Sequence, residues 1–302
     1  GGNMGARETD LAYMAVCANM GPVSERWIEE LFTHAYSSGL NKGGFDDETL
    51  INTMTREGPV WIAALGYAYG YLDSKSNMAE ILSRVTSGKW RARCNLYDER
   101  LYPKFRAEFD TWPRMLVAGQ FGPNYGDSGG PRGSRYPEGI VKNLRLEYER
   151  AYRRWPTDEI AREIEQIAQQ AQASTEAGGF MRAGYGLTSL EVGSGEAGTA
   201  LWSFFGRSFG HGHHDRLNIG IYGFGLKLSP DLGYPEFATR WPKRGEWTDN
   251  TISHNTVIVD EKPQTSNWGG QPVFFKRLPG LSAVELRSEN VYEACDVYAR
   301  TL

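Results

Sequence analysis

The first half of the chain repeats apolar residues at helical spacing, with polar residues on the opposite face. The clearest example is residues 24–38, where Ser24 is the expected N-cap. The apolar face of this segment consists of Trp27, Ile28, Leu31, Phe32 and Ala35. Similar spacing predicts further helices over residues 52–72, 103–119, 141–155 and 157–174. Gly58-Pro59 and Pro113 must break or begin two of these helices. Successive amphipathic helices predict paired helices packed in a layer or ring.

From about residue 178 onward the pattern changes to the period of two that is typical of strands. Glycine-punctuated apolar runs predict strands and hairpins. These runs cover residues 187–192, 199–206, 217–228, 254–260, 273–278 and 282–288. Strands without helical periodicity predict an antiparallel sheet or sandwich. The expected fold class is therefore α+β, with a helical domain over residues 1–178 and a β domain over residues 179–302.

Composition limits the partners of the protein. A length of 302 residues suffices for two domains with substantial cores, and the net charge of −4, without a long basic run, argues against nucleic acid as a partner. The chain has no apolar run of about 18 residues, so no membrane span is expected. Three distant cysteines without a CxxC motif indicate free, buried thiols rather than a disulfide framework or a thiolate zinc site. Neither end resembles a natural terminus, so we expect a fragment of a longer protein.

Histidine is scarce in this chain and is concentrated beside a glycine-rich run. Three of the five histidines are His211, His213 and His214. In an extended segment His211 and His213 share a face, and His214 points to the other face. Separate roles for the first pair would require a bend at the glycine between them. His213, Asp231 and His254 could converge on one metal ion, and imidazole with carboxylate suits zinc.

Other interpretations of these histidines remain open. They could cap strand ends or satisfy buried hydrogen bonds. The run HGHHDR is close to the HxHxDH motif of metallo-β-lactamases but has Arg216 at the last position. A cupin would need a glutamate a few residues after its histidine pair, and the run DRLNIG supplies none.

Three short motifs follow one another within residues 185–264, namely GHxHxD, Asp-x-Gly-Tyr and HNTxxVD, with a glutamine shortly after the third. The matching residues are Gly210, His211, His213, Asp215, Asp231, Gly233, Tyr234, His254, Asn255, Thr256, Val259, Asp260 and Gln264. In this order the motifs resemble the heparinase II/III-like family of polysaccharide lyases. The resemblance implies an incomplete α/α toroid followed by an antiparallel β-sandwich. It also implies a helical domain longer than the one seen here, in agreement with a fragment.

The resemblance further implies a lyase that cleaves a uronic-acid-containing polysaccharide by β-elimination, with tyrosine and histidine as acid and base. It implies that His211 faces the substrate and that His213, Asp231 and His254 bind a structural zinc ion. His214 has no counterpart in the family, so we expect a structural role for it. Asp215 is expected to orient a histidine.

The remaining site residues are expected from the helical half and from nearby loops. Tyr125, with Tyr136 in reserve, lies in a glycine-rich loop that resembles the family's Gly-Asp-Ser segment and would supply the catalytic tyrosine. Glu57 resembles a glutamate at a helix start that lines the cleft in some members. Residues expected to contact the substrate are Tyr234, Arg207, Arg240, Lys243 and Arg244.

The expected partner is thus an acidic polysaccharide, and the family implies a periplasmic or secreted protein. The sequence leaves open which uronan is cleaved, whether cleavage is endo or exo, and the oligomeric state. Two other functions remain as alternatives. The chain could be a non-catalytic, zinc-stabilised carbohydrate-binding relative, or a cupin-like metalloenzyme.

Overall fold

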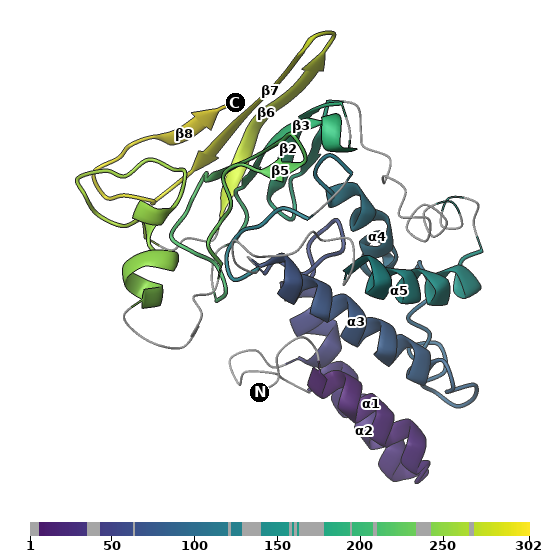
Figure 1. The fold of residues 1–302 in the computed structure, drawn as a ribbon. Helices are drawn as coiled ribbons and strands as arrows, with labels where there is room; N and C mark the ends of the chain where they lie inside the picture. The colour runs from purple at the N-terminus through teal and green to yellow at the C-terminus, as the bar shows by residue number, and fades with distance from the viewer. Residues whose placement is uncertain are drawn as a thin grey trace. The chain divides into compact units, whose positions relative to one another are not determined.

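The structure is a computed structural model, in which helices are followed along the chain by strands (Figure 1). The residues that the structure describes are 6–34, 43–62, 64–119, 122–128, 140–156, 159, 162, 178–193, 195–207, 210–233, 243–265 and 269–302. The chain forms two compact units that interleave along the sequence. The first comprises Gly1–Val60, Tyr67–Thr111 and Glu147–Ile160, and the second comprises Trp61–Gly66, Trp112–Leu146 and Ala161–Leu302.

Helices come first along the chain, as the apolar spacing predicts. They are α1 (Ala6–Ala18), α2 (Pro22–Thr33), the π-helical η2 (Phe45–Thr53), α3 (Leu65–Leu82), α4 (Pro103–Thr111), the short 3-10 helix η3 (Pro113–Met115) and α5 (Ile140–Arg154). Pro113 separates α4 from η3, as expected. In α2 the predicted face buries Ile28, Leu31 and Phe32. The helix predicted over residues 157–174 lies outside the described residues, except for residues 159 and 162.

One local expectation in the helical part is wrong. The N-cap of α2 is Gly21 rather than Ser24, because Pro22 already has the backbone angle of a first helical residue and has no N–H to satisfy. The Ser24 hydroxyl instead accepts a hydrogen bond from the Met20 N–H at 2.9 Å. The stretch 52–72 is interrupted at Gly58-Pro59, as expected, since the Thr55 N–H donates to the Pro59 carbonyl at 3.0 Å and closes a turn before α3 begins.

Two antiparallel sheets follow the helices. The first has the order β1 (Phe180–Arg182), β2 (Leu187–Val192), β3 (Thr199–Phe204), β4 (Ile219–Gly223) and β5 (Leu226–Lys227), and the second has the order β6 (Gly270–Leu278), β7 (Leu281–Ser288) and β8 (Tyr298–Thr301). Both sheets contribute to one hydrophobic cluster built on Phe205, Leu217, Val284 and Leu286, against which Leu190 of β2 and Phe275 of β6 pack. The expectation of an α+β fold with antiparallel sheets is confirmed.

The strand expected over residues 254–260 is absent from the described structure. His254 instead follows the 3-10 helix η6 (Thr251–Ser253), which the Asn250 side chain caps by accepting the Ile252 N–H at 3.2 Å. The apolar residues that suggested a strand, Val257 and Ile258, are exposed. Asp260 has a φ of 52°, which no regular strand contains. The segment is a loop, and its side-chain hydrogen bonds are described below.

All three cysteines are free, as expected, but only Cys94 is buried, while Cys17 is exposed. Among the residues that the structure describes, no helix has the length and apolar character needed to cross a membrane.

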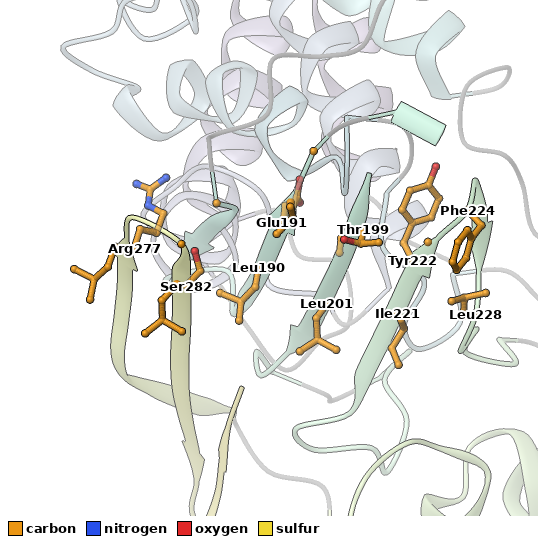
Figure 2. Close-up of a pocket in the computed structure, with 18 residues that line it drawn as sticks. Leu190, Glu191, Thr199, Leu201, Ile221, Tyr222, Phe224, Leu228, Arg277 and Ser282 are labelled. Carbon is orange, nitrogen blue, oxygen red and sulfur yellow. The ribbon is translucent and has the colours of Figure 1, made fainter. Parts of the chain in front are cut away.

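A groove of about 980 Å³ lies over one face of the first sheet (Figure 2). Leu190, Leu201 and Ile221 are direct cross-strand partners on β2, β3 and β4 and form an apolar row there. The groove contains none of the residues that the sequence assigns to the functional site. The histidine cluster is therefore a separate feature of the same unit.

The pairing of β3 with β4 depends on one glycine. Gly220 lies directly opposite Trp202, and a Cβ atom added at Gly220 would lie 2.0 Å from Cε2 of the buried indole. We expect Gly220→Ala to lower the free energy of unfolding by about 1–3 kcal/mol, the usual cost of overpacking a core. Urea unfolding followed by tryptophan fluorescence measures this.

Gly223→Ala in the same strand is the matched control. Its Cβ would meet Thr199 Cγ2 at 3.5 Å and Leu228 Cδ1 at 3.6 Å, which are ordinary contacts. Equal stabilities for the two variants would contradict the packing described here.

Candidate metal centre and histidine cluster

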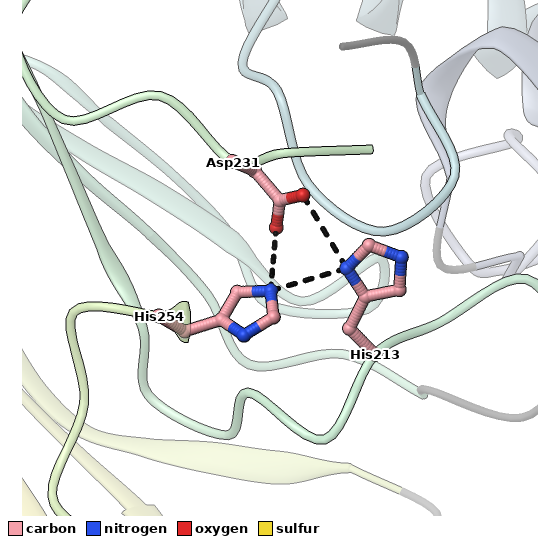
Figure 3. A group of neighbouring side chains, drawn as sticks. All are labelled: His213, Asp231 and His254. Atoms are coloured by element: carbon pink, nitrogen blue, oxygen red, sulfur yellow. Dashed lines mark hydrogen bonds and ion pairs between the residues drawn. The ribbon is translucent and has the colours of Figure 1, made fainter. Parts of the chain in front are cut away.

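Three buried side chains meet at one point in the second unit (Figure 3). His213 Nδ1 lies 3.1 Å from His254 Nε2. The two oxygens of the Asp231 carboxylate lie 3.3 Å from His213 Nδ1 and 3.2 Å from His254 Nε2. One ligand atom from each residue lies within 4.8 Å of the others. The structure therefore brings together the three residues that the sequence assigns to metal binding.

The second nitrogen of each imidazole fixes which nitrogen carries a proton. His213 Nε2 lies 3.2 Å from Asp127 Oδ1, and His254 Nδ1 lies 2.9 Å from the Asn250 carbonyl oxygen. A carboxylate and a carbonyl only accept hydrogen bonds, so these nitrogens are the donors. In the neutral rings, His213 Nδ1 and His254 Nε2 then direct lone pairs at each other and at Asp231. Metal-binding histidines have this arrangement of outer contacts.

The electrostatics of the cluster require positive charge among these three residues. Burial lowers the pKa of His213, but hydrogen bonds to Asp127 and Asp231 outweigh it and raise the pKa to about 10. Burial raises the pKa of Asp231, but hydrogen bonds from His213 and His254 lower it to about 2. Without a metal ion the histidines therefore hold protons against the carboxylate. A divalent cation can replace those protons, since it satisfies all three ligands together.

The donor set fits a metal ion. Asp231 Oδ1 accepts the Gly233 N–H at 2.8 Å, and the Asn124 side chain holds the Asp231 carbonyl oxygen at 3.1 Å. Asp231 Oδ2 is buried, and His254 Nε2 lies 3.2 Å from it. Two imidazole nitrogens and a carboxylate oxygen suit zinc and similar transition metals.

Hydrogen bonds from the HNT motif and its glutamine hold the loop that carries His254. The Asn255 N–H donates to Asn218 Oδ1 at 2.9 Å, and the Thr256 hydroxyl donates to the Arg216 carbonyl at 2.6 Å. The Gln264 amide donates to that same carbonyl at 3.3 Å, and its oxygen accepts the Arg216 N–H. The motif therefore docks the His254 loop onto the chain segment that follows His213. This explains why a loop can take the place of the expected strand.

Asp127 is a residue of the cluster that the sequence analysis did not assign. Its side chain is fully buried, and its carboxylate contacts His211, His213 and Arg244. Burial raises the pKa of Asp127, but these three partners outweigh it and hold the pKa well below its usual range. The available signal was the Gly-Asp-Ser segment, in which only the neighbouring Tyr125 was assigned a role.

The histidine pair His211 and His213 differs in exposure. The His211 side chain is 26% exposed, whereas that of His213 is fully buried. His214 contacts Asp249 instead, with Nδ1 3.2 Å from Oδ1. Asp215 is buried, and burial raises its pKa, while the nearby His254 and His213 act in the opposite direction.

Tyr125 lies buried in the second unit, in contact with Phe204 and Tyr185. Tyr125 is 1% exposed and its ring stacks on Phe204 at a centroid distance of 4.2 Å. Its hydroxyl donates to the Tyr185 hydroxyl at 2.7 Å. A catalytic role for Tyr125 therefore stays a prediction.

The other predicted site residues have separate surroundings. Glu57 belongs to the first unit and lies in the turn before α3, where its carbonyl accepts the Thr111 hydroxyl at 2.6 Å. The Arg207 guanidinium lies 5.1 Å from the Trp61 ring centroid, and Lys243 is exposed. Arg244 binds Asp127. Tyr136, Tyr234 and Arg240 lie outside the described residues.

Comparisons with known proteins agree with the motif. Residues 168–301 match the family model described as Heparinase II/III-like, C-terminal. An alginate lyase from Stenotrophomonas maltophilia (strain K279a) is 36% identical over 93 residues, which cover 28% of this chain and 12% of that protein.

The fold is similar to that of solved lyases. A heparinase III with methylated lysines has a TM-score of 0.71 at 13% identity, covering 97% of this chain and 42% of its own. Heparan sulfate lyase HepC from Pedobacter heparinus has a TM-score of 0.63 at 11% identity, covering 94% of this chain and 41% of its own. The chain thus spans less than half the length of these relatives.

Metal binding gives the first test of this site. We expect the purified chain to hold one divalent metal ion and to lose thermal stability when a chelator removes it, because the ion no longer joins the three segments that carry its ligands. His213→Ala should weaken binding by more than the roughly 10–100-fold that outer contacts contribute. Elemental analysis and thermal unfolding measure both effects.

His214→Ala is the matched control, because His214 contacts Asp249 rather than Asp231. It should retain the metal. A melting temperature of the wild-type chain that does not change when a chelator is added would contradict the assignment of a metal site.

Proposed function

We propose that this chain, whose residues 168–301 match the family model described as Heparinase II/III-like, C-terminal, is part of a polysaccharide lyase acting on a uronic-acid-containing polysaccharide. The observation that supports it most directly is the cluster in that domain. A candidate metal triad lies next to a partly exposed histidine whose ring is anchored to a buried carboxylate. The relatives named alginate lyase, heparinase III and heparan sulfate lyase support an acidic polysaccharide as the substrate class.

β-Elimination makes three demands on the protein. The uronate carboxylate must be neutralised, the C5 proton must be removed, and the departing O4 must be protonated. We assign His211 as the base or charge neutraliser. Its Nδ1 lies 2.9 Å from Asp127 Oδ2, and because a carboxylate only accepts, this nitrogen carries the proton. The opposite nitrogen, Nε2, is then the atom that His211 would present to the substrate.

We propose zinc as the metal and a structural role for it. Zinc, when bound, would hold His213, Asp231 and His254 together and satisfy their lone pairs. The three ligands come from three separate segments, so their attachment to one ion would fix the backbone on which His211 lies. Glu57 remains a proposed catalytic residue, and Tyr234, Arg207 and Arg240 remain proposed substrate-binding residues.

The proposal also covers the architecture and the location that the family implies. We propose that the helices belong to an incomplete α/α toroid over residues 1–178 and that the sheets form a β-sandwich over residues 179–302. The hydrophobic cluster shared by the two sheets supports the sandwich. A periplasmic or secreted location is proposed with the same family.

The lyase reaction can be detected through its product. The chain, or the longer protein that contains it, is incubated with alginate, heparan sulfate and chondroitin sulfate. We expect at least one to give the ultraviolet absorbance of an unsaturated uronate. His211→Ala should reduce turnover by about 10²–10⁴-fold, the usual contribution of a positioned acid or base.

His214→Ala should keep its turnover within a few fold. Reducing ends that appear without the new double bond would indicate hydrolysis and contradict the proposal. Sugar binding without turnover, unaffected by His211→Ala, would instead support a non-catalytic carbohydrate-binding protein.

A further substitution distinguishes a packing role of Tyr125 from a catalytic one. Because its hydroxyl is buried and donates to Tyr185, we expect Tyr125→Phe to lower stability by about 1 kcal/mol and to change turnover less than tenfold. Tyr185→Phe, which removes the other partner of the same hydrogen bond, is the matched comparison. A loss of turnover above 100-fold at unchanged stability would establish Tyr125 as the proton donor.

A further inference from the structure

The carboxylate of Asp127 joins two histidines with different predicted roles. One oxygen, Oδ1, lies 3.2 Å from Nε2 of the metal-triad residue His213. The other oxygen, Oδ2, lies 2.9 Å from Nδ1 of the partly exposed His211. The two imidazoles are thus two hydrogen bonds apart through a single planar group.

Asp127 is held rigidly in this position. Arg244 donates to both carboxylate oxygens, with Nη2 lying 2.9 Å from Oδ2, in the bidentate geometry that fixes a carboxylate plane. The Asp127 N–H also donates to the His211 carbonyl at 2.9 Å. Since the carboxylate is completely buried, rotating it away would leave charged groups without partners.

We propose that Asp127 is a positioning residue that couples the metal centre to His211. A metal on His213 Nδ1 strengthens the hydrogen bond that His213 Nε2–H donates to Asp127. The same carboxylate fixes the tautomer and ring orientation of His211. Metal binding therefore changes the hydrogen bonding and ring orientation of His211, although His211 is not a ligand. The significance for catalysis rests on the proposed lyase function, whereas the coupling itself does not.

Two measurements test the coupling without any substrate. In wild-type protein with nitrogen-labelled histidine, adding Zn²⁺ to the metal-free chain should shift the His211 ring resonances as well as those of His213 and His254. In Asp127→Asn, the apparent Zn²⁺ affinity, measured by chelator competition, should fall about 10–100-fold. The His211 ring should also lose the nitrogen spectrum of its single tautomer.

Asp249→Asn is the matched control, because Asp249 is a carboxylate that contacts a neighbouring histidine, His214, which is not a ligand. The zinc affinity of the Asp249→Asn variant should change less than about threefold, since Asp249 does not contact a metal ligand. Asp127→Glu retains the charge and should recover part of the affinity. If Asp127→Asn does not fold, the wild-type titration alone decides the question.

In an active preparation saturated with zinc, Asp127→Asn should lower kcat far more than it changes KM, because misplacement of His211 affects the reacting geometry. Zinc addition that leaves the His211 resonances unchanged, or Asp127→Asn with wild-type zinc affinity, would overturn the proposal. Absence of lyase activity together with both expected metal results would refute the proposed function and leave the coupling intact.

Discussion

This part of the protein depends on one constraint, which is that two imidazole nitrogens and a carboxylate are buried together at one point. His213 Nδ1, His254 Nε2 and the Asp231 carboxylate face one another across distances of 3.1–3.3 Å. Their outer partners, Asp127 and the Asn250 carbonyl, fix the ring protons on the opposite nitrogens. Such an arrangement repels itself unless protons on the imidazoles or a metal cation lie between the three groups. A metal ion bound there would connect three segments that lie apart in the chain.

Loops rather than strands carry the site, and side chains hold those loops in place. His254 follows a 3-10 helix, and Asn255, Thr256 and Gln264 attach its loop to residues 216–218. The side chains of Asn218, Thr256 and Gln264 satisfy backbone groups that would otherwise pair in a sheet. The two sheets, joined by the cluster of Phe205, Leu217, Val284 and Leu286, provide the rigid support beneath them. Binding residues placed on loops above a rigid scaffold are common in enzymes.

Much of this arrangement can be predicted from the sequence, and the rest cannot for identifiable reasons. Helix α2 and strands β2, β3 and β7 follow from the spacing of apolar residues, and the candidate metal triad follows from the clustering of scarce histidines. The segment 254–260 was predicted as a strand because its apolar residues alternate, but alternation does not reveal that side chains such as Thr256 replace the sheet hydrogen bonds. Asp127 was not assigned because it lies 84 residues from His211, and no local pattern encodes that contact. Its burial and four hydrogen bonds become evident only when the loops are placed in space.

X-ray absorption at the zinc edge of the zinc-loaded chain tests the central claim most directly, because it reports the ligands of the ion itself. The account predicts light-atom ligands at about 2.0–2.1 Å, with the multiple-scattering pattern of two imidazoles and no sulfur. His254→Ala should reduce that pattern to one imidazole. A spectrum with sulfur at about 2.3 Å, or one without imidazole scattering, would contradict the assignment of His213, Asp231 and His254 as the metal ligands.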